Sequence, residues 1–403
     1  MNPLHLSHFT ATTCLGRGLA PNVAALRDER SGLARCCFET VDLDTFVGEV
    51  AGVDDVILPA ALADFDCRNN RLAALGLVQD DFIDRVAAAR AQHGPERIGV
   101  FIGTSTSGIL QTELAYRRRD PLTAALPNDF FYATTQNSFS VTEFVRRTLQ
   151  LSGPAATVSS ACSSSAKVFG SAARMVEAGL IDAAVVGGVD SLCLSTLYGF
   201  TSLQLTSTRP CRPFDRDRDG LSIAEAAAFF LMERLPDEPA ASAIVLLGVG
   251  ESSDAHHMSS PHPEGLGAKL AMEQALATAA LTPDAIDYVN LHGTGTRSND
   301  LAEGRAMLGL FGNATRCSST KGAVGHTLGA AGGVEAVFCA LALRHGFMPG
   351  GVNTRELDPA LPLAYLLHDE ARAPSRVLSN SFGFGGTNCS LALGRADAPN
   401  VAT

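Results

Sequence analysis

The chain has 403 residues, of which 46% are hydrophobic, and its formal net charge is −11. This length and apolar content allow a sizeable core, arranged as two domains or as one large duplicated unit. The acidic balance argues against a general nucleic-acid-binding protein, because such proteins need a basic field that displaces counterions.

Short apolar runs alternate with helical patterns along the chain, which predicts an α/β fold. The 38 glycines, mostly beside apolar runs, suit strand-to-helix turns. An alanine-rich periodic segment at 268–280 predicts a helix, and Thr282 can cap another helix that begins at Pro283. Buried strands are expected at residues 98–103, 183–187, 243–247, 288–291 and 376–379.

A polar, proline-bearing segment at 236–242 separates two apolar stretches. It is the predicted boundary between an N-terminal half, residues 1–240, and a C-terminal half, residues 241–403. No repeat of 20–50 residues is visible at the level of sequence.

The cysteines and the apolar runs predict a reduced, soluble, cytoplasmic protein without a membrane partner. The ten cysteines are scattered and form no C-x-x-C pair. No basic segment precedes an apolar leader, and no apolar run reaches the roughly 18 to 20 residues that span a bilayer.

Cys162 lies in the segment V-S-S-A-C-S-S-S-A at 158–166, between an apolar run and a helical pattern. The N-terminus of a helix carries partial positive charge, which favours the nucleophilic thiolate. The segment therefore fits a nucleophile, although a small buried hydrophobic residue is the commoner role of a free cysteine.

Three glycine-rich segments follow in the second half. His292 opens H-G-T-G-T directly after an expected strand, where α/β proteins place ligands. Lys321 and His326 bracket K-G-A-V-G-H, and residues 380–388 read N-S-F-G-F-G-G-T-N, whose glycines permit a turn with inward-facing backbone N–H groups. None matches a phosphate-binding pattern, and each alone also fits an ordinary loop.

Together and in this order, these four segments resemble the β-ketoacyl-acyl-carrier-protein synthases, the condensing enzymes of the thiolase superfamily. Further matches are R-P-F-D-R-D-R-D-G at 212–220, G-G-V-D-S at 187–191, and the acids Asp300 and Glu303. The resemblance spans residues 95–393. It implies a thiolase-like α/β fold in which two related halves form five αβαβα layers, and it implies no cofactor.

The resemblance also implies a Cys-His-His site. Cys162 would carry an acyl group as a thioester. His292 and His326 would donate from their Nε2 atoms to the enolate oxygen formed when a malonyl thioester decarboxylates. The backbone N–H groups of Cys162 and Phe384 would hold the oxyanion, and Lys321 would act electrostatically.

The remaining implied residues support or line this site. Lys321 would pair with Glu303, whereas an ordinary buried ion pair explains Asp300 equally well. Phe384 would gate the acyl pocket. The other expected lining residues are Phe382 beside the gate, Thr294 and Thr296 in the phosphopantetheine channel, Gly108 and Ile109 at the acyl pocket, and residues 134–139 across a dimer interface.

Two histidines in the motifs separate the chain from thiolases and from the initiating Cys-His-Asn synthases, and Cys162 separates it from chain-length factors. Residues 66–71, 221–231 and 253–264 look most like the synthases of bacterial aryl polyene pathways. Residues 221–231 lack the glycine-rich strand common in elongating synthases, which leaves close backbone approach there in doubt.

The implied partners are an acyl carrier protein and either a second copy of the chain or a chain-length-factor-like subunit. Two other functions stay open: a non-catalytic scaffold subunit, and a thiolase-like acyltransferase that uses coenzyme A.

Two arginine-rich runs have a possible binding role, and one group of histidines has the residue type of a metal site. Arg117–Arg119 and the arginines of 209–218 are candidates for docking an acidic partner, although alternation with aspartates in the second run favours an internally paired network. The histidines at 256, 257 and 262 lack an ordered acidic or cysteine companion, so no metal site is predicted there.

Overall fold

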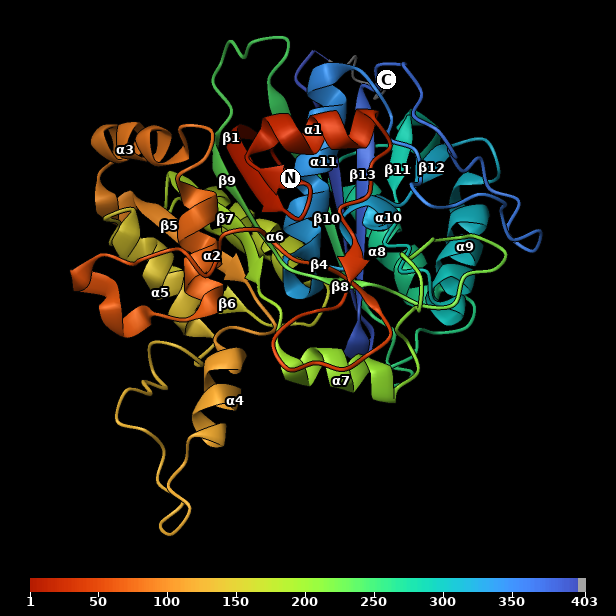
Figure 1. Ribbon diagram of the computed structural model, residues 1–403. Helices are drawn as coiled ribbons and strands as arrows, with labels where there is room; N and C mark the ends of the chain where they lie inside the picture. Colours follow the sequence, from red (N-terminus) through yellow and green to blue (C-terminus); the bar gives the residue numbers. More distant parts are fainter. Residues whose placement is uncertain (398–403) are drawn as a thin grey trace.

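The computed structural model describes residues 1–397, and a large mixed sheet runs through its centre (Figure 1). Its strands from the first part of the chain are β1 (Leu4–Thr13), β2 (Gly16–Arg17), β5 (Ile98–Gly103), β6 (Ala155–Val158), β7 (Ala183–Asp190) and β9 (Ala226–Arg234). Those from the second part are β10 (Ile244–Ser253), β11 (Tyr288–Asn290), β12 (Arg316–Ser318), β13 (Arg376–Gly383) and β14 (Thr387–Arg395).

Both parts of the sheet follow the same path. The order is β6-β5-β7-β9-β1 in the first and β12-β11-β13-β14-β10 in the second, with β2 beside β1. In each part, the first two neighbouring pairs are parallel and the last two are antiparallel. A short antiparallel ladder between β1 and β10 joins them. The structure thus contains one topology twice, although the sequence shows no repeat.

Helices complete five layers (Figure 1). On the first set of strands pack α2 (Arg68–Leu77), α3 (Phe82–His93) and α5 (Phe139–Thr148). On the second set packs α8 (Leu266–Thr278), and α9 (Arg297–Phe311) packs on α8 and shares an apolar cluster with β11 and β13. Between the sets lie α6 (Ser164–Glu177) and α11 (Ala331–His345), which contact each other and strands of both sets. This arrangement confirms the predicted αβαβα layering.

The other elements lie around these layers. The helices are α1 (Leu19–Arg27), α4 (Ile109–Arg117), α7 (Leu194–Ser202) and α10 (Lys321–Val324). A small sheet contains β3 (Ala34–Arg35), β4 (Phe46–Gly48) and β8 (Ile223–Ala224). The 3₁₀ turns are η1 (Ala60–Phe65), η2 (Pro95–Arg97), η3 (Pro283–Ala285), η4 (Leu328–Ala330) and η5 (Phe384–Gly386).

The central helix α11 is apolar almost all round, which is the pattern of a helix enclosed by protein. Every residue from Ala331 to Leu343 is buried, and Gly346 ends the helix in the left-handed conformation with φ 67°. Together with η4 it forms an 18-residue segment, Leu328–His345, that is long and apolar enough to cross a bilayer, which the sequence did not suggest. Because 89% of this segment is buried within the protein, it is a core helix rather than a membrane span.

Most of the predicted elements are present. The expected strands correspond to β5, β7, β10, β11 and β13, and the alanine-rich helix is α8. The helix predicted at Pro283 is wrong: only the single turn η3 forms, and the Thr282 side chain makes no capping hydrogen bond. Ile286 is already buried and β11 begins at Tyr288, so the chain enters the sheet before a helix can continue.

Close backbone approach near residues 221–231 is provided by the neighbouring strand. These residues form β8 and the start of β9. A Cβ atom added to Gly187 of β7 would lie 2.0 Å from the carbonyl oxygen of Ala228, so the glycine required for close contact lies on β7.

Candidate active site

Four loops at the C-terminal ends of strands meet around one pocket. The loop after β6 carries Cys162, and the loop after β11 carries His292. The segment after β12 carries Lys321 and His326, and η5 after β13 begins at Phe384. In α/β sheets such strand ends are the usual place for ligands. The structure therefore gathers the four sequence motifs that were predicted to act together.

A sharp turn presents Cys162 between β6 and α6. Ala161 has a φ of 51°, a left-handed conformation that non-glycine residues rarely adopt and that recurs at active sites. The Ser164 hydroxyl holds the turn, because it accepts the Ser160 N–H at 2.9 Å and donates to the Ala161 carbonyl at 2.5 Å. The thiol is thus aimed by the backbone, and the Cys162 residue is only 5% exposed.

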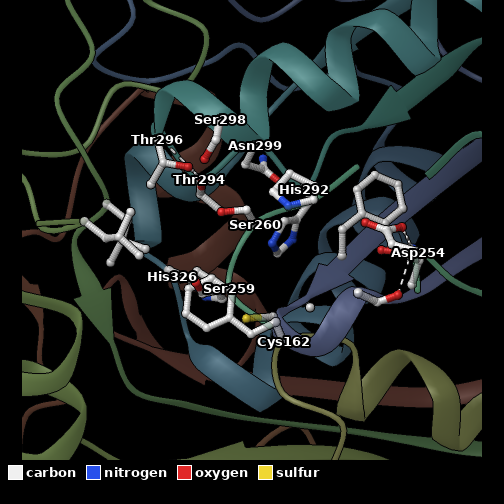
Figure 2. Close-up of a pocket in the computed structure, with 18 of the residues that line it drawn as sticks. Cys162, Asp254, Ser259, Ser260, His292, Thr294, Thr296, Ser298, Asn299 and His326 are labelled. Carbon is white, nitrogen blue, oxygen red and sulfur yellow. Dashed lines mark hydrogen bonds between the residues drawn. The ribbon is translucent and has the colours of Figure 1, made fainter. Parts of the chain in front are cut away.

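Cys162 and both histidines converge within reacting distance (Figure 2). A side-chain nitrogen of each histidine and the Cys162 Sγ all lie within 4.8 Å of one another. The two imidazole rings are nearly perpendicular, with centroids 5.3 Å apart. A small thioester group placed between them can contact the sulfur and both rings at once.

Hydrogen bonds assign the tautomer of each histidine. The Leu328 N–H donates to Nδ1 of His326 at 3.0 Å, and the Lys321 ammonium lies 3.3 Å from Nδ1 of His292. A neutral imidazole whose Nδ1 accepts carries its proton on Nε2. Burial, followed by the charge of Lys321, holds the pKa of both histidines well below the usual value, so both are neutral Nε2–H donors.

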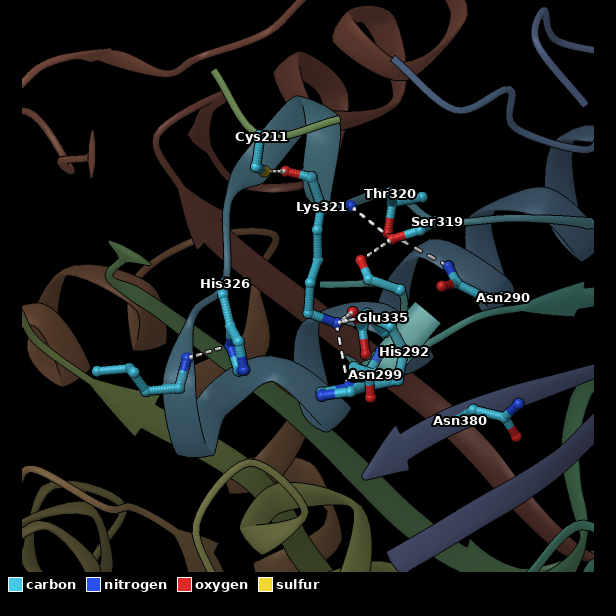
Figure 3. Close-up of polar contacts among 12 residues, drawn as sticks. Cys211, Asn290, His292, Asn299, Ser319, Thr320, Lys321, His326, Glu335 and Asn380 are labelled. Atoms are coloured by element: carbon cyan, nitrogen blue, oxygen red, sulfur yellow. Dashed lines mark hydrogen bonds and ion pairs between the residues drawn. The ribbon is translucent and has the colours of Figure 1, made fainter. Parts of the chain in front are cut away.

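The acidic partner of Lys321 differs from the prediction (Figure 3). Its Nζ forms a short ion pair with Glu335 of α11 and also donates to the His292 carbonyl at 2.5 Å. Glu303 was the expected partner, and this is wrong because Glu303 binds backbone N–H groups instead. Burial raises the pKa of Glu335 to about 7 while Lys321 lowers it. The signal for Glu335 in the sequence was a lone acid within an otherwise apolar helical run.

Glu303 shapes the loop that carries His292. Its two carboxyl oxygens accept the N–H groups of His292 at 2.8 Å and Gly293 at 2.7 Å, and Asn380 also donates to it at 3.2 Å. Burial raises the pKa of Glu303 to about 7. Glu303 therefore fixes the backbone of this loop.

Asp300 joins the same loop to the arginine-rich segment. It accepts the Phe214 N–H at 2.8 Å and lies 3.4 Å from Nε of the buried Arg218. This is the buried ion pair that the sequence allowed.

The sequence favours pairing of the arginines at 212–218 with the aspartates of the same run, but most of their partners lie elsewhere in the chain. Arg216 pairs with Glu356 and Arg218 also with Asp358, whereas Arg212 pairs with Asp219 inside the run. The chain folds back so that residues 355–358 pack against this run, and these acids are distant in sequence. Of the other run, Arg118 pairs with Asp129 and Arg117 donates to the Thr40 hydroxyl.

The pocket has a volume of about 550 Å³, including its open mouth. Thr294, Thr296, Phe382 and Phe384 line it as predicted, together with Cys162 and both histidines. The Thr294 and Thr296 hydroxyls are 2.9 Å apart. Sequence reasoning missed a group of further lining residues, which includes Phe200, Asp254, Ser259, Ser260, Asn299 and Asn388.

The segment from Asp254 to Pro261 covers one side of the pocket and is bound to η5. Asp254 accepts a hydrogen bond from the Asn388 side-chain amide at 2.7 Å, and the Gly385 N–H donates to the Met258 carbonyl at 2.7 Å. Residues 253–264 were noted in the sequence only for a subfamily likeness, because nothing local shows that they fold over the nucleophile.

Gly108 and Ile109 do not line this pocket. Gly108 precedes α4 and donates its N–H to the Thr135 carbonyl at 3.0 Å. Ile109 packs against an apolar cluster that contains Leu328. Their expected role at the acyl end of the site stays a prediction.

The thiol of Cys162 is harder to ionise than a helix N-terminus alone suggests. Burial raises its pKa to about 11, while the Lys321 charge and the backbone N–H groups of Phe384 and Cys162 lower it. Desolvation therefore outweighs the positive charge that the sequence pattern implied. The backbone N–H groups of Phe384 and Cys162 therefore lie close to the sulfur. An acyl group bound to that sulfur would have its carbonyl oxygen in the same region.

Comparison with known proteins identifies the family. The N-terminal domain of β-ketoacyl synthases matches residues 77–238, and the C-terminal domain matches residues 243–355. The 3-oxoacyl-[acyl-carrier-protein] synthase 2 of Rhizobium meliloti is 36% identical over 312 residues, which cover 74% of each chain. The chain belongs to the β-ketoacyl synthase family. It is a β-ketoacyl-acyl-carrier-protein synthase, an acyltransferase that forms carbon–carbon bonds.

Other similar proteins support the family and the thiolase-like fold. The mitochondrial 3-oxoacyl-[acyl-carrier-protein] synthase of Arabidopsis thaliana is 39% identical over 257 residues, 59% of this synthase and 56% of that relative. Among solved structures, the ketosynthase ApeO in complex with its chain length factor ApeC from Xenorhabdus doucetiae matches with a TM-score of 0.88 and 39% identity, over 98% of both chains. A β-ketoacyl synthase from Burkholderia phymatum matches with a TM-score of 0.85 and 29% identity, over 98% of this synthase and all of that chain.

Proposed function

We propose that this synthase elongates an acyl chain on Cys162 by decarboxylative condensation with a malonyl thioester. The observation that carries this proposal is the convergence of the Cys162 Sγ with two neutral histidines at a single pocket. A nucleophile beside two neutral N–H donors suits a reaction in which one oxygen becomes negative without a proton being transferred to it.

In the first half-reaction, Cys162 Sγ attacks the carbonyl of an acyl thioester on a carrier protein. The new C–S bond forms as the carrier thiolate leaves, and the proton of the Cys162 thiol ends on the carrier thiol. The N–H groups of Cys162 and Phe384 hold the oxyanion, which is supported by the action of both on the sulfur.

In the second half-reaction, the malonyl C–C bond breaks and carbon dioxide leaves. The electron pair moves toward the thioester oxygen, which accepts hydrogen bonds from Nε2 of His292 and His326. The resulting carbanion attacks the acyl carbonyl, forms the new C–C bond and expels the Cys162 thiolate, which takes up one proton. Lys321 keeps the tautomer of His292 by its contact with Nδ1.

We further propose that the acyl chain is of the aryl polyene type and that the thioesters are delivered by an acyl carrier protein in the cytoplasm. The likeness of residues 66–71, 221–231 and 253–264 to aryl polyene synthases supports the acyl class. The ten cysteines, all free and all within the described residues, suit a reducing compartment.

The proposed second subunit is chain-length-factor-like. The similarity to a ketosynthase that was solved with its chain length factor supports this choice over a homodimer. The projecting helix α4 and the loop that follows it expose apolar side chains, including Tyr116, Leu122 and Tyr132. Such a surface suits contact with a second subunit, whether it is chain-length-factor-like or another copy of this chain.

The test is intact-mass spectrometry of the purified protein, incubated with acyl-carrier-protein thioesters, for wild type and Cys162→Ala. An acyl adduct on wild type alone is expected. Absence of an adduct with every donor, including the natural carrier, would instead support the scaffold function. An adduct from acyl-coenzyme A but never from carrier-bound acyl groups would support a thiolase-like acyltransferase.

A further inference from the structure

Asp190, the last residue of β7, is a buried carboxylate without a cationic partner. Its residue exposure is 0%, and no ion pair to it is found in residues 1–397. A charge in such a place is stable only when hydrogen bonds replace its hydration. The G-G-V-D-S motif that contains it has no part in the reaction as described above.

The hydrogen bonds to Asp190 come from two loops. From the loop after β5 it accepts the Thr104 hydroxyl at 2.6 Å, the Ser105 N–H at 2.8 Å and hydroxyl at 2.5 Å, and the Thr106 N–H at 2.9 Å and hydroxyl at 2.8 Å. From the segment after His326 it accepts the Gly329 N–H at 2.5 Å. A carboxylate has about four lone-pair sites, so its acceptor capacity is filled.

The bond from Gly329 lies next to the one that orients His326. Two successive N–H groups of η4 diverge: that of Leu328 donates to Nδ1 of His326, and that of Gly329 donates to Asp190. We propose that Asp190 is a positioning residue for His326, which anchors this turn so that the imidazole keeps its Nε2–H toward the Cys162 thiol.

The turn needs such an anchor because its backbone is strained. Leu328 has a φ of 53°, a conformation that costs free energy for a branched residue. The packing is also tight: a Cβ atom added to Gly329 would lie 2.7 Å from the Asp190 carboxylate and 2.8 Å from the Ser105 nitrogen. The turn therefore depends on contact with Asp190 and the loop after β5.

Asp190 also acts on the nucleophile through its charge. It raises the pKa of Cys162, in opposition to Lys321. Removal of this charge alone should make the thiol easier to ionise, whereas a loss of packing alone would have no such effect.

This inference rests on the proposed function, in which the two half-reactions use different groups. Acylation needs the Cys162 thiol and two backbone N–H groups. Decarboxylation needs the oriented Nε2–H of His326. Asp190→Asn replaces one acceptor by an amide that cannot accept, so it should weaken the second half-reaction and spare the first.

The experiment compares full-length wild type, Asp190→Asn and a control, Asp215→Asn. Asp215 is also a buried carboxylate, and it accepts the N–H groups of Asp217, Arg355 and Glu356 without contacting the pocket. Acyl transfer to Cys162 is followed by intact mass, and carbon dioxide release is followed with malonyl-acyl-carrier-protein. Alkylation of Cys162 by iodoacetamide is measured against pH.

For Asp190→Asn we expect decarboxylation to be at least about tenfold slower, since the loss of one oriented donor typically costs 10²–10³ in rate. Acylation should change by less than about threefold, because it uses the backbone N–H groups of the oxyanion site and not His326. The pH dependence of Cys162 alkylation should move to lower pH. Asp215→Asn should change neither the ratio of the decarboxylation rate to the acylation rate nor the pH dependence of Cys162 alkylation.

Equal losses in both half-reactions, or unchanged decarboxylation, would overturn the inference. If Asp190→Asn does not fold, Gly329→Ala disturbs the same contact from the other side. For the inference to stand, this variant must also slow decarboxylation while leaving acylation nearly unchanged. A wild-type chain that forms no adduct would instead refute the proposed function, and this inference with it.

Discussion

Phe384 stacks on Phe200, with ring centroids 5.3 Å apart and ring planes 22° apart. Phe384 begins η5 beside the nucleophile, and Phe200 belongs to α7, so the stack ties the proposed gate to a separate helix. Both rings line the pocket.

Phe200→Ala should free the ring of Phe384 and alter acyl loading. Stacked aromatic pairs contribute about 0.5–1.5 kcal/mol, so the stacked position should lose up to roughly tenfold in population. Intact-mass spectrometry of samples quenched at successive times should show that the rate of Cys162 acylation changes several-fold. Phe200→Leu preserves much of the volume without the stack and should behave similarly. Unchanged rates in both variants would show that the stack does not control entry.

The high pKa of Cys162 predicts an unusual pH profile. The thiolate is the form that reacts with iodoacetamide, and burial raises the thiol pKa to about 11. The alkylation rate should therefore still rise steeply above about pH 10, whereas a thiol with the ordinary pKa of about 8.5 is almost fully ionised by that pH and its rate has levelled off. A plateau reached by about pH 10 would contradict the buried, protonated resting state. The exposed Cys37, replaced by Ser in all samples, must not contribute to the signal.

The Lys321–Glu335 pair allows stability and catalysis to be separated. Lys321→Ala leaves the Glu335 carboxylate buried without its cation, which costs about 3–5 kcal/mol. The double variant Lys321→Met with Glu335→Leu removes both charges, so thermal unfolding should recover most of the loss. Decarboxylation should stay low because Nδ1 of His292 no longer has its donor. Recovery of activity along with stability would contradict the assigned tautomer.

Glu303 predicts a stability difference that depends on pH. Its pKa is raised from 4.5 to about 7 in the folded protein, so the folded state holds this proton more tightly than the unfolded chain. The unfolding free energy of wild type relative to Glu303→Gln should fall as pH rises from 4.5 to 7, by on the order of 3 kcal/mol at most. Urea unfolding at several pH values measures this difference. Parallel stability curves would mean that Glu303 is ionised throughout this range.

That Cys162 and the two histidines lie together was predictable, because each stands in a short contiguous motif after a strand. Contacts between residues from distant parts of the chain were not predictable in this way. The family resemblance implied Glu303 as the partner of Lys321, but the partner in the structure is Glu335, which faces Lys321 from the central helix α11.

The rest of the pocket depended on the order of the strands. Phe200 comes from α7 and Asp254 follows β10, and neither lies in a pattern that indicates chemistry. They meet at the nucleophile only because the two sets of strands pack on opposite sides of the central helices. The pKa of Cys162 was misjudged for a related reason: the extent of its burial is set by loops from the other half of the chain.

The repeated strand path places Cys162 and the two histidines in different copies of one topology. Cys162 follows β6, the edge strand of its set, and Lys321 with His326 follows β12, the edge strand of the other. Equivalent corners of the two parts thus carry different residues, a thiol in one and an imidazole in the other. The proposed condensation therefore draws on both parts of the chain, because the Cys162 sulfur and the nitrogens of His292 and His326 come together only where the two parts meet.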